Sequence, residues 1–156
     1  MKRFLLLAAS HALVLGVGFA AGIYALPLLT EPAPPSSEHI ARVRAAAAYT
    51  AGFRRDLTGS DLLHWGEGTV WVARDAIALE GHLAPGPDYK LYLSPEFVET
   101  RADFLRLKPR MQRVGDVRTF SGFLVPVPPD VDVGRYTTVV VWCESFGKFI
   151  TAAKYR

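Results

Sequence analysis

The chain has only one cysteine, Cys143, among its 156 residues. A single cysteine cannot form an internal disulfide, so the fold is not a disulfide-stapled scaffold. The sequence also lacks a serine with a matching His and Asp set, a pair of candidate catalytic carboxylates and the full glycine pattern of a phosphate-binding loop. The sequence therefore contains no residue set of a conventional hydrolase, and Cys143 is the first candidate for any chemistry.

Net charge is nearly absent once the first three residues are set aside. Lys2 and Arg3 account for two of the 18 Lys and Arg residues, and the others face 15 Asp and Glu residues. A protein that binds nucleic acid usually carries a basic patch to meet the phosphates. The near-neutral balance gives no such signal, and we expect no nucleic-acid partner.

Charged residues are missing altogether from Phe4–Leu29. About 20 apolar residues in a helix span a hydrocarbon core of ~30 Å. Lys2 and Arg3 precede the stretch, and positive charge next to a span tends to stay cytoplasmic. The sequence therefore predicts an N-terminal membrane anchor with the remaining chain on the extracytoplasmic side, periplasmic or extracellular. A cleaved signal peptide is the alternative, because small residues occur near the end of the stretch.

The segment after the apolar stretch is rich in proline and serine. Thr30–Ser37 reads TEPAPPSS, a composition that favours extended chain and indicates a stalk. An alanine-rich run follows, which predicts a short helix capped by Ser37 and ended by Gly52. The sequence thus divides into a membrane anchor at residues 1–29, a stalk with a short helix at 30–50, and a β domain at 51–156.

From Ala51 onward, short apolar runs alternate with turn residues, a spacing typical of sandwiches and barrels. The expected fold class is all-β: a small β-sandwich or barrel of about seven to nine strands after one N-terminal transmembrane helix. Residues 95–113 are more charged and less periodic, and they favour a short helix near 98–107 or a long loop. Strands are expected at 52–57, 68–73, 76–80 and 89–94, and at 115–121 and 123–127 as a pair.

The C-terminal stretch predicts a β-hairpin that contains Cys143. Residues 137–142 are nearly all β-branched or aromatic, which favours a strand. The run breaks at 144–147, where Gly147 can adopt a positive φ, and a second strand-like run follows. Because side chains alternate along a strand, Trp142 and Cys143 should point to opposite faces. Glu144 shares the face of Trp142 and prefers solvent, so Cys143 is expected to point inward.

Two sequence blocks are specific enough to indicate a family. They are GPDYKLYLS at 86–94 and VVVWCESF at 139–146, with shorter matching pieces at 52–53, 63–68 and 79–80. Together they make the chain from Gly52 to Tyr155 resemble the DM-thirteen domain, a small β-rich extracytoplasmic module described as an electron-transfer domain. The resemblance implies a membrane-associated redox role centred on Cys143, as a free thiol or as a ligand for a group such as haem. It also implies another redox protein of the cell envelope as a partner.

Cys143 and His64 are the candidate site residues, Cys143 for catalysis and both for binding a cofactor. A thiolate and an imidazole can hold a haem iron, although the spacing to His64 and His82 matches no metal signature, and no metal site is predicted. The alternative is that Cys143 is a small buried hydrophobe and His64 a partly buried loop residue. On that interpretation, the chain is a non-catalytic binding or adhesion domain of the cell envelope that holds no cofactor.

Overall fold

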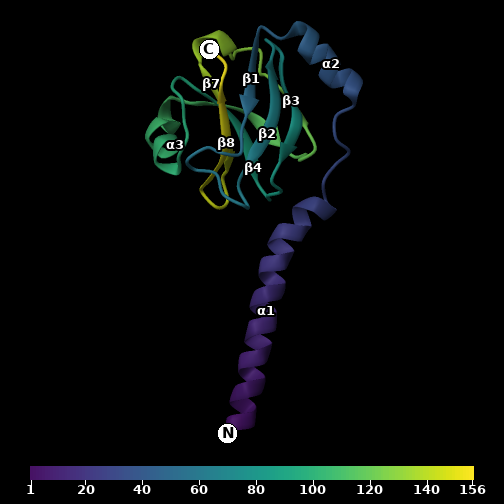
Figure 1. Ribbon diagram of the computed structural model, residues 1–156, viewed down its shortest axis with the longest axis vertical. Coiled ribbons are helices and arrows are strands. Elements are labelled where there is room, and N and C mark those ends of the chain that lie inside the picture. Colours follow the sequence, from purple (N-terminus) through teal and green to yellow (C-terminus); the bar gives the residue numbers. More distant parts are fainter.

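In the computed structural model, which describes all residues 1–156, a long N-terminal helix leads to a β-sandwich of two four-stranded sheets (Figure 1). This confirms the expected fold class, as a sandwich. The helices are α1 (Lys2–Leu29), α2 (Ser37–Ala46) and α3 (Arg101–Leu107), with short 3-10 turns η1 (Lys108–Arg110) and η2 (Val133–Arg135). The strands are β1 (Tyr49–Phe53), β2 (Gly66–Val72), β3 (Ala76–Leu83), β4 (Tyr89–Ser94), β5 (Gln112–Val117), β6 (Phe123–Pro126), β7 (Thr138–Cys143) and β8 (Lys148–Lys154).

Helix α1 projects from one end of the sandwich (Figure 1). It has 28 residues, and the mean hydropathy of its most apolar window is 2.1. None of that window is buried by the rest of the chain, and Pro27 is the only buried residue of the helix. An uncovered apolar helix of this length is suited to a membrane anchor, and a signal sequence has the same properties.

Helix α2 joins the stalk to the sandwich. It begins one residue earlier than expected, because Ser36 and not Ser37 caps it by accepting a hydrogen bond from the backbone N–H of His39 at 3.3 Å. The helix ends well before Gly52, and that part of the prediction is wrong. Gly52 instead pairs with Thr69 inside β1, so the first strand lies at 49–53 and not at 52–57.

Both sheets are antiparallel, with strand orders β1-β2-β3-β6 and β5-β4-β7-β8. The predicted pairing of 115–121 with 123–127 is therefore wrong, since β5 pairs with β4 and β6 pairs with β3. The chain crosses from one sheet to the other between them, and Gly122 has a φ of 86° in this crossing. The crossing lets Val117 and Phe123 face the same core from opposite sheets.

Two apolar layers lie on the two faces of the β5-β4-β7-β8 sheet. The larger one fills the space between the sheets and contains Val141 and Cys143. The smaller one lies under α3, where the ring of Phe104 stacks on Trp142 with centroids 3.8 Å apart and planes 6° from parallel. Trp142 and Cys143 thus face opposite sides of β7, which confirms that prediction. The face of Trp142 is buried as well, because α3 covers it.

The C-terminal hairpin has the predicted form. β7 ends at Cys143, β8 begins at Lys148, and Gly147 has a φ of 57° in the turn between them. This turn lies at the end of the sandwich that faces α1, whereas the C-terminus lies at the far end (Figure 1). The hairpin therefore places Cys143 close to the junction of helix and domain.

The layer under α3 can be tested with two leucines of the same helix. Leu107 is fully buried and Leu105 is 43% exposed. We expect Leu107→Ala to lower the free energy of unfolding by about 2–5 kcal/mol, because it leaves a cavity. Leu105→Ala should cost less than about 1 kcal/mol, since exposed positions contribute little. Denaturant unfolding of the two variants measures both values, and equal losses would contradict the packing of α3 on β7.

Candidate functional site

A cavity of about 240 Å³ lies between the end of the sandwich and the last turns of α1. Cys143 lines it from the end of β7, His64 from the loop between β1 and β2, and Tyr89 from the start of β4. Tyr24 of α1 lines the opposite side. The fold therefore brings the two site residues expected from the sequence, Cys143 and His64, into one cavity from distant parts of the chain.

Cys143 is a buried free thiol, with only 2% of its surface exposed. Burial raises the pKa of the thiol above its ordinary value, and the backbone N–H groups of Phe146, Asp88 and Ser145 offset this only in part. At neutral pH the sulfur therefore carries its proton. Because the thiolate is the strong nucleophile and metal ligand, this environment does not activate Cys143 for either role.

His64 is held in place by Asp61. Its Nδ1 lies 2.8 Å from Oδ1 of Asp61, and the same oxygen accepts the backbone N–H of Leu63 at 2.8 Å. Burial acts to raise the pKa of Asp61, but the hydrogen bonds from His64 and Leu63 lower it overall, so the carboxylate is charged. A carboxylate can only accept, so Nδ1 carries the proton and Nε2 is left without a protein partner.

His82, the third residue of the spacing considered in the sequence, lies elsewhere. It is exposed on β3, opposite Glu67 of β2, and it does not line the cavity. No group of three His, Cys, Asp or Glu side chains in the chain is placed to hold a metal ion. The candidate site therefore consists of one thiol, one imidazole and their neighbours.

Tyr89 is the residue of the cavity that sequence reasoning missed. It is 3% exposed, yet its hydroxyl has no hydrogen-bond partner in the protein. The other two buried tyrosines differ, because Tyr92 donates to Glu144 and Tyr155 donates to the carbonyl of Val133. Burial raises the pKa of Tyr89, with further contributions from the neighbouring Cys143, Tyr24 and Asp61. It is therefore a neutral phenol with an unused polar group in the cavity wall.

Gly86 makes room for the tip of this tyrosine. A Cβ at position 86 would lie 2.4 Å from the Tyr89 hydroxyl oxygen and from two ring carbons. Any larger residue would thus push the ring out of its place. The loop at 84–88 is therefore also a wall of the cavity.

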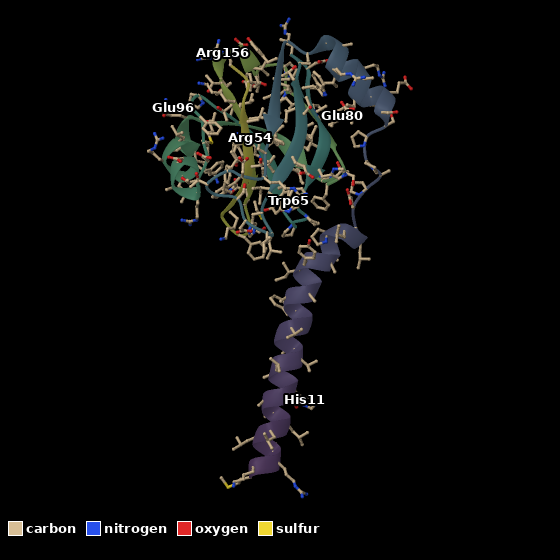
Figure 2. All side chains as sticks on the ribbon, in the orientation of Figure 1. His11, Arg54, Trp65, Glu80, Glu96 and Arg156 are labelled. Carbon is tan, nitrogen blue, oxygen red and sulfur yellow. The ribbon has the colours of Figure 1, made fainter.

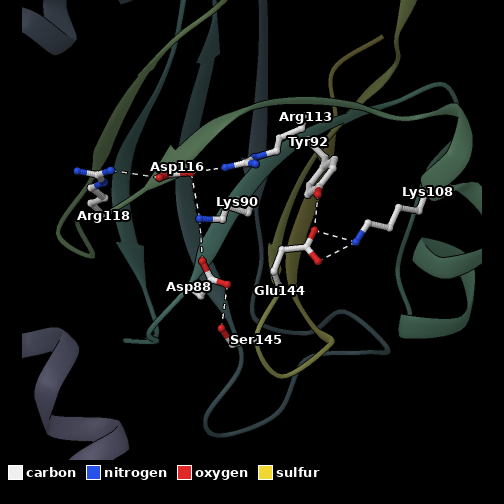
Figure 3. Close-up of polar contacts among 9 residues, drawn as sticks. All are labelled: Asp88, Lys90, Tyr92, Lys108, Arg113, Asp116, Arg118, Glu144 and Ser145. Carbon is white, nitrogen blue, oxygen red and sulfur yellow. Dashed lines mark hydrogen bonds and ion pairs between the residues drawn. The ribbon is translucent and has the colours of Figure 1, made fainter.

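Two polar clusters include Glu144 and Ser145, the two residues that follow Cys143 in the chain (Figure 3). In one, Asp88 accepts a hydrogen bond from Ser145 at 2.8 Å and forms an ion pair with Lys90 at 2.7 Å, and Lys90 also reaches Asp116 at 3.0 Å. In the other, Glu144 binds Tyr92 and Lys108 (Figure 3). These contacts tie the turn after β7 to the loop before β4, and so fix both loops that surround the thiol.

A family model described as Electron transfer DM13 matches residues 57–155. The chain belongs to this family. The resemblance found in the sequence is confirmed, and the β domain is an electron-transfer-related module. The match includes every cavity residue that the sandwich contributes, from Leu63 to Phe146. Comparisons with curated proteins and with solved structures give no match.

The residues of this DM-thirteen domain do not fit a haem. The cavity of about 240 Å³ is smaller than the range of roughly 300–1,000 Å³ that is usual for drug-sized ligands. Cysteine holds a haem iron as a thiolate, and burial disfavours that form of Cys143. The cofactor-binding role of Cys143 and His64 stays a prediction, and any ligand of the cavity has to be smaller than a porphyrin.

The polar cluster of the DM-thirteen domain leads to a pH prediction. Hydrogen bonds from Lys90 and then Arg113 lower the pKa of Asp116 to about 2, so the charged form is stabilised in the folded state. This stabilisation is complete above the unfolded pKa of about 3.9 and is lost as the pH falls toward 2. We expect Asp116→Asn to cost about 1 kcal/mol at pH 7 and almost nothing near pH 2.

The measurement is the free energy of unfolding of wild type and variant from pH 7 down to pH 2. Asp130→Asn is the matched control, because Asp130 is exposed and makes no ion pair. If the difference in free energy of unfolding between wild type and Asp116→Asn stays constant across this pH range, the ion pairs of Asp116 do not stabilise the fold as described.

Proposed function

We propose that this DM-thirteen protein is a membrane-tethered electron-transfer module on the extracytoplasmic side, and that Cys143 is the centre of its site. Family membership supports the redox role. The long uncovered helix α1 supports the tether, and Lys2 and Arg3 at its start favour a cytoplasmic N-terminus. The domain, which follows α1, is then held close to the far surface of the membrane.

The placement of Cys143 in the wall of a cavity is the observation that carries the proposal. A cysteine with only a packing role needs no cavity beside it, whereas here Tyr89 and His64 line the same space. A thiol can change its oxidation state, and an imidazole can accept or donate a proton. The thiol supplies a redox group and the imidazole a proton carrier, and an electron-transfer site with coupled proton movement needs both.

Burial limits how this site is used. A protonated thiol that is 2% exposed does not exchange disulfides with solutes in bulk water. The reactant therefore has to reach Cys143 through the cavity, on the side that α1 and the loops of the sandwich form. Another redox protein of the cell envelope is the proposed source or acceptor of the electrons.

The second candidate function is a non-catalytic binding or adhesion domain of the cell envelope. The low exposure and raised pKa of Cys143 favour it, because structural buried cysteines share both properties. Under this alternative, the cavity and its polar residues have no redox role, and the thiol only fills space between the sheets.

The tether predicts where a C-terminal fusion is active. A reporter enzyme that works only outside the cytoplasm, fused after Arg156, should be active, since the whole domain follows α1. The fusion protein should also stay in the membrane fraction after an alkaline wash. Recovery of a shortened, soluble protein would show that α1 is a cleaved signal sequence and would contradict the tether.

Replacement of Cys143 separates the two candidate functions. We expect Cys143→Ala to fold with a loss of about 1–2 kcal/mol, because little volume is removed. It should lose the electron exchange of the full chain with an electrode, measured by voltammetry in lipid nanodiscs. Val114→Ala is the matched control, since Val114 lies in the same core but not at the cavity, and this variant should keep the exchange.

If Cys143→Ala exchanges electrons like the wild type, Cys143 is structural and the binding domain is the better account. An absorbance spectrum with metal analysis of the wild type checks the fit argument independently. A haem band from the purified chain would contradict the conclusion that the cavity is too small and the thiol too basic.

A further inference from the structure

The cavity lies at the depth at which α1 would leave the hydrocarbon core. From Phe4 to Tyr24, α1 advances by roughly 30 Å at about 1.5 Å per residue, which is the thickness of that core. Tyr24, at the upper end of this distance, is the α1 side chain that lines the cavity together with Ala20 and Ile23. An aromatic residue at this depth is typical of the membrane–water interface.

The end of the sandwich beside α1 is also suited to the interface. Leu62 is 94% exposed, Leu63 57% and Phe146 53%, although large apolar residues of the domain are otherwise mostly buried. Leu63 and Phe146 line the cavity. Trp65 lies at the same end of the sandwich (Figure 2). These side chains surround the cavity with apolar surface that a membrane would cover.

Apart from the imidazole of His64, the lining of the cavity holds no side chain that is charged at neutral pH. No Asp, Glu, Lys or Arg side chain contributes to it, whereas the adjoining cavity on the other side of Tyr89 is lined by Asp88, Lys90, Asp116 and Arg118. A charged lipid headgroup would find no partner in the neutral cavity. The ligand it suits is apolar, carries no charge and is about the size of one substituted ring.

Two polar atoms in this apolar lining indicate the hydrogen-bonding groups of that ligand. The Tyr89 hydroxyl, on a side chain that is 3% exposed, is a donor without a partner in the protein, and Nε2 is an acceptor in the neutral form of His64, whose Nδ1 proton faces Asp61. A ligand with one oxygen that accepts from the first and one hydroxyl that donates to the second would satisfy both. A plain acyl chain would satisfy neither.

We propose that this cavity binds the ring of a membrane-soluble quinone and its quinol, with the alkyl tail of the ligand in the bilayer. Tyr89 donates a hydrogen bond to one ring oxygen, which is a carbonyl in the quinone and a hydroxyl in the quinol. His64 accepts a hydrogen bond from the other ring hydroxyl of the quinol. The proposal rests on the membrane tether and electron-transfer role proposed above, and it names the small molecule that reaches Cys143. Electron carriers of this class are dissolved in the membrane, where the mouth of the cavity would lie.

Binding can be measured on the full chain in lipid nanodiscs with a decyl-substituted 1,4-benzoquinone as the probe. Quenching of tryptophan fluorescence, with Trp65 next to His64 as a reporter, should saturate as the quinone fills the cavity. Tyr89→Phe removes one neutral hydrogen bond and should weaken binding about tenfold. Tyr136→Phe, which makes the same change outside the cavity, should bind like the wild type.

A second pair of variants leaves the core of the sandwich intact. Ala20→Phe fills the cavity from the side of α1 and should abolish saturable quenching, whereas Ala21→Phe, on the neighbouring exposed residue, should not. Quenching that is unsaturable, or equal in all four variants, would reflect quinone dissolved in the lipid and would overturn the proposal. Displacement of the quinone by decanol at equal concentration would also overturn the proposal, because the cavity would then be a site for alkyl chains.

The experiments distinguish a failure of quinone binding from a failure of the proposed function. If voltammetry depends on Cys143 and no quinone binds, the electron-transfer role stands and only the ligand is wrong. If the fusion protein is released as a soluble domain, the tether fails, and with it the route by which a membrane-soluble ligand would arrive.

Discussion

The burial of β7 on both of its faces is the constraint on which the domain depends. All six of its residues are buried, and β4 and β8 pair with it on either side. One face packs against the opposite sheet and the other packs under α3. A strand enclosed in this way cannot slip in register without moving apolar residues from one layer to another. The position of its last residue, Cys143, is therefore fixed by the whole sandwich.

What surrounds the end of β7 determines the chemistry that Cys143 can do. The backbone N–H of Glu144 binds the carbonyl of Asp88, so the turn after β7 and the loop before β4 are joined directly. The charges of Asp88, Lys90 and Asp116 pair with one another outside the thiol. Because these three side chains pair with one another outside the thiol, none of them lines the cavity beside Cys143. This pairing therefore keeps charged side chains away from both the buried, protonated thiol and the cavity.

The local parts of this structure could be predicted from the sequence, and the non-local parts could not. The hairpin of β7 and β8 follows from β-branched residues and Gly147, which act over a few positions. The partner of β5 depends on strands far away in the chain, so an apparent neighbour pairing with β6 was wrong. The layer formed by α3 was missed for the same reason, because nothing in the alternation of β7 shows that Trp142 is covered.

The candidate site divides in the same way. Cys143 and His64 could be selected by residue type and by the resemblance to the DM-thirteen family, but their meeting in one cavity depends on the fold. In the sequence, Tyr89 occupies one of the apolar positions of an alternating strand. Only the structure shows that its hydroxyl lacks a partner and that Gly86 leaves space for the ring. The contribution of α1 to the cavity could not be predicted, because the sequence places helix and domain in separate segments.

The central claim is that helix and sandwich form one site at the membrane surface, next to Cys143. Photolabelling of the full chain in nanodiscs with an azido-substituted quinone, followed by mass spectrometry of the labelled peptides, tests it most directly. The account predicts labels concentrated on the α1 turn that contains Tyr24, on the loop around His64 and on the turn that contains Phe146. Labels spread evenly along the lipid-exposed length of α1, with none on the sandwich, would contradict it.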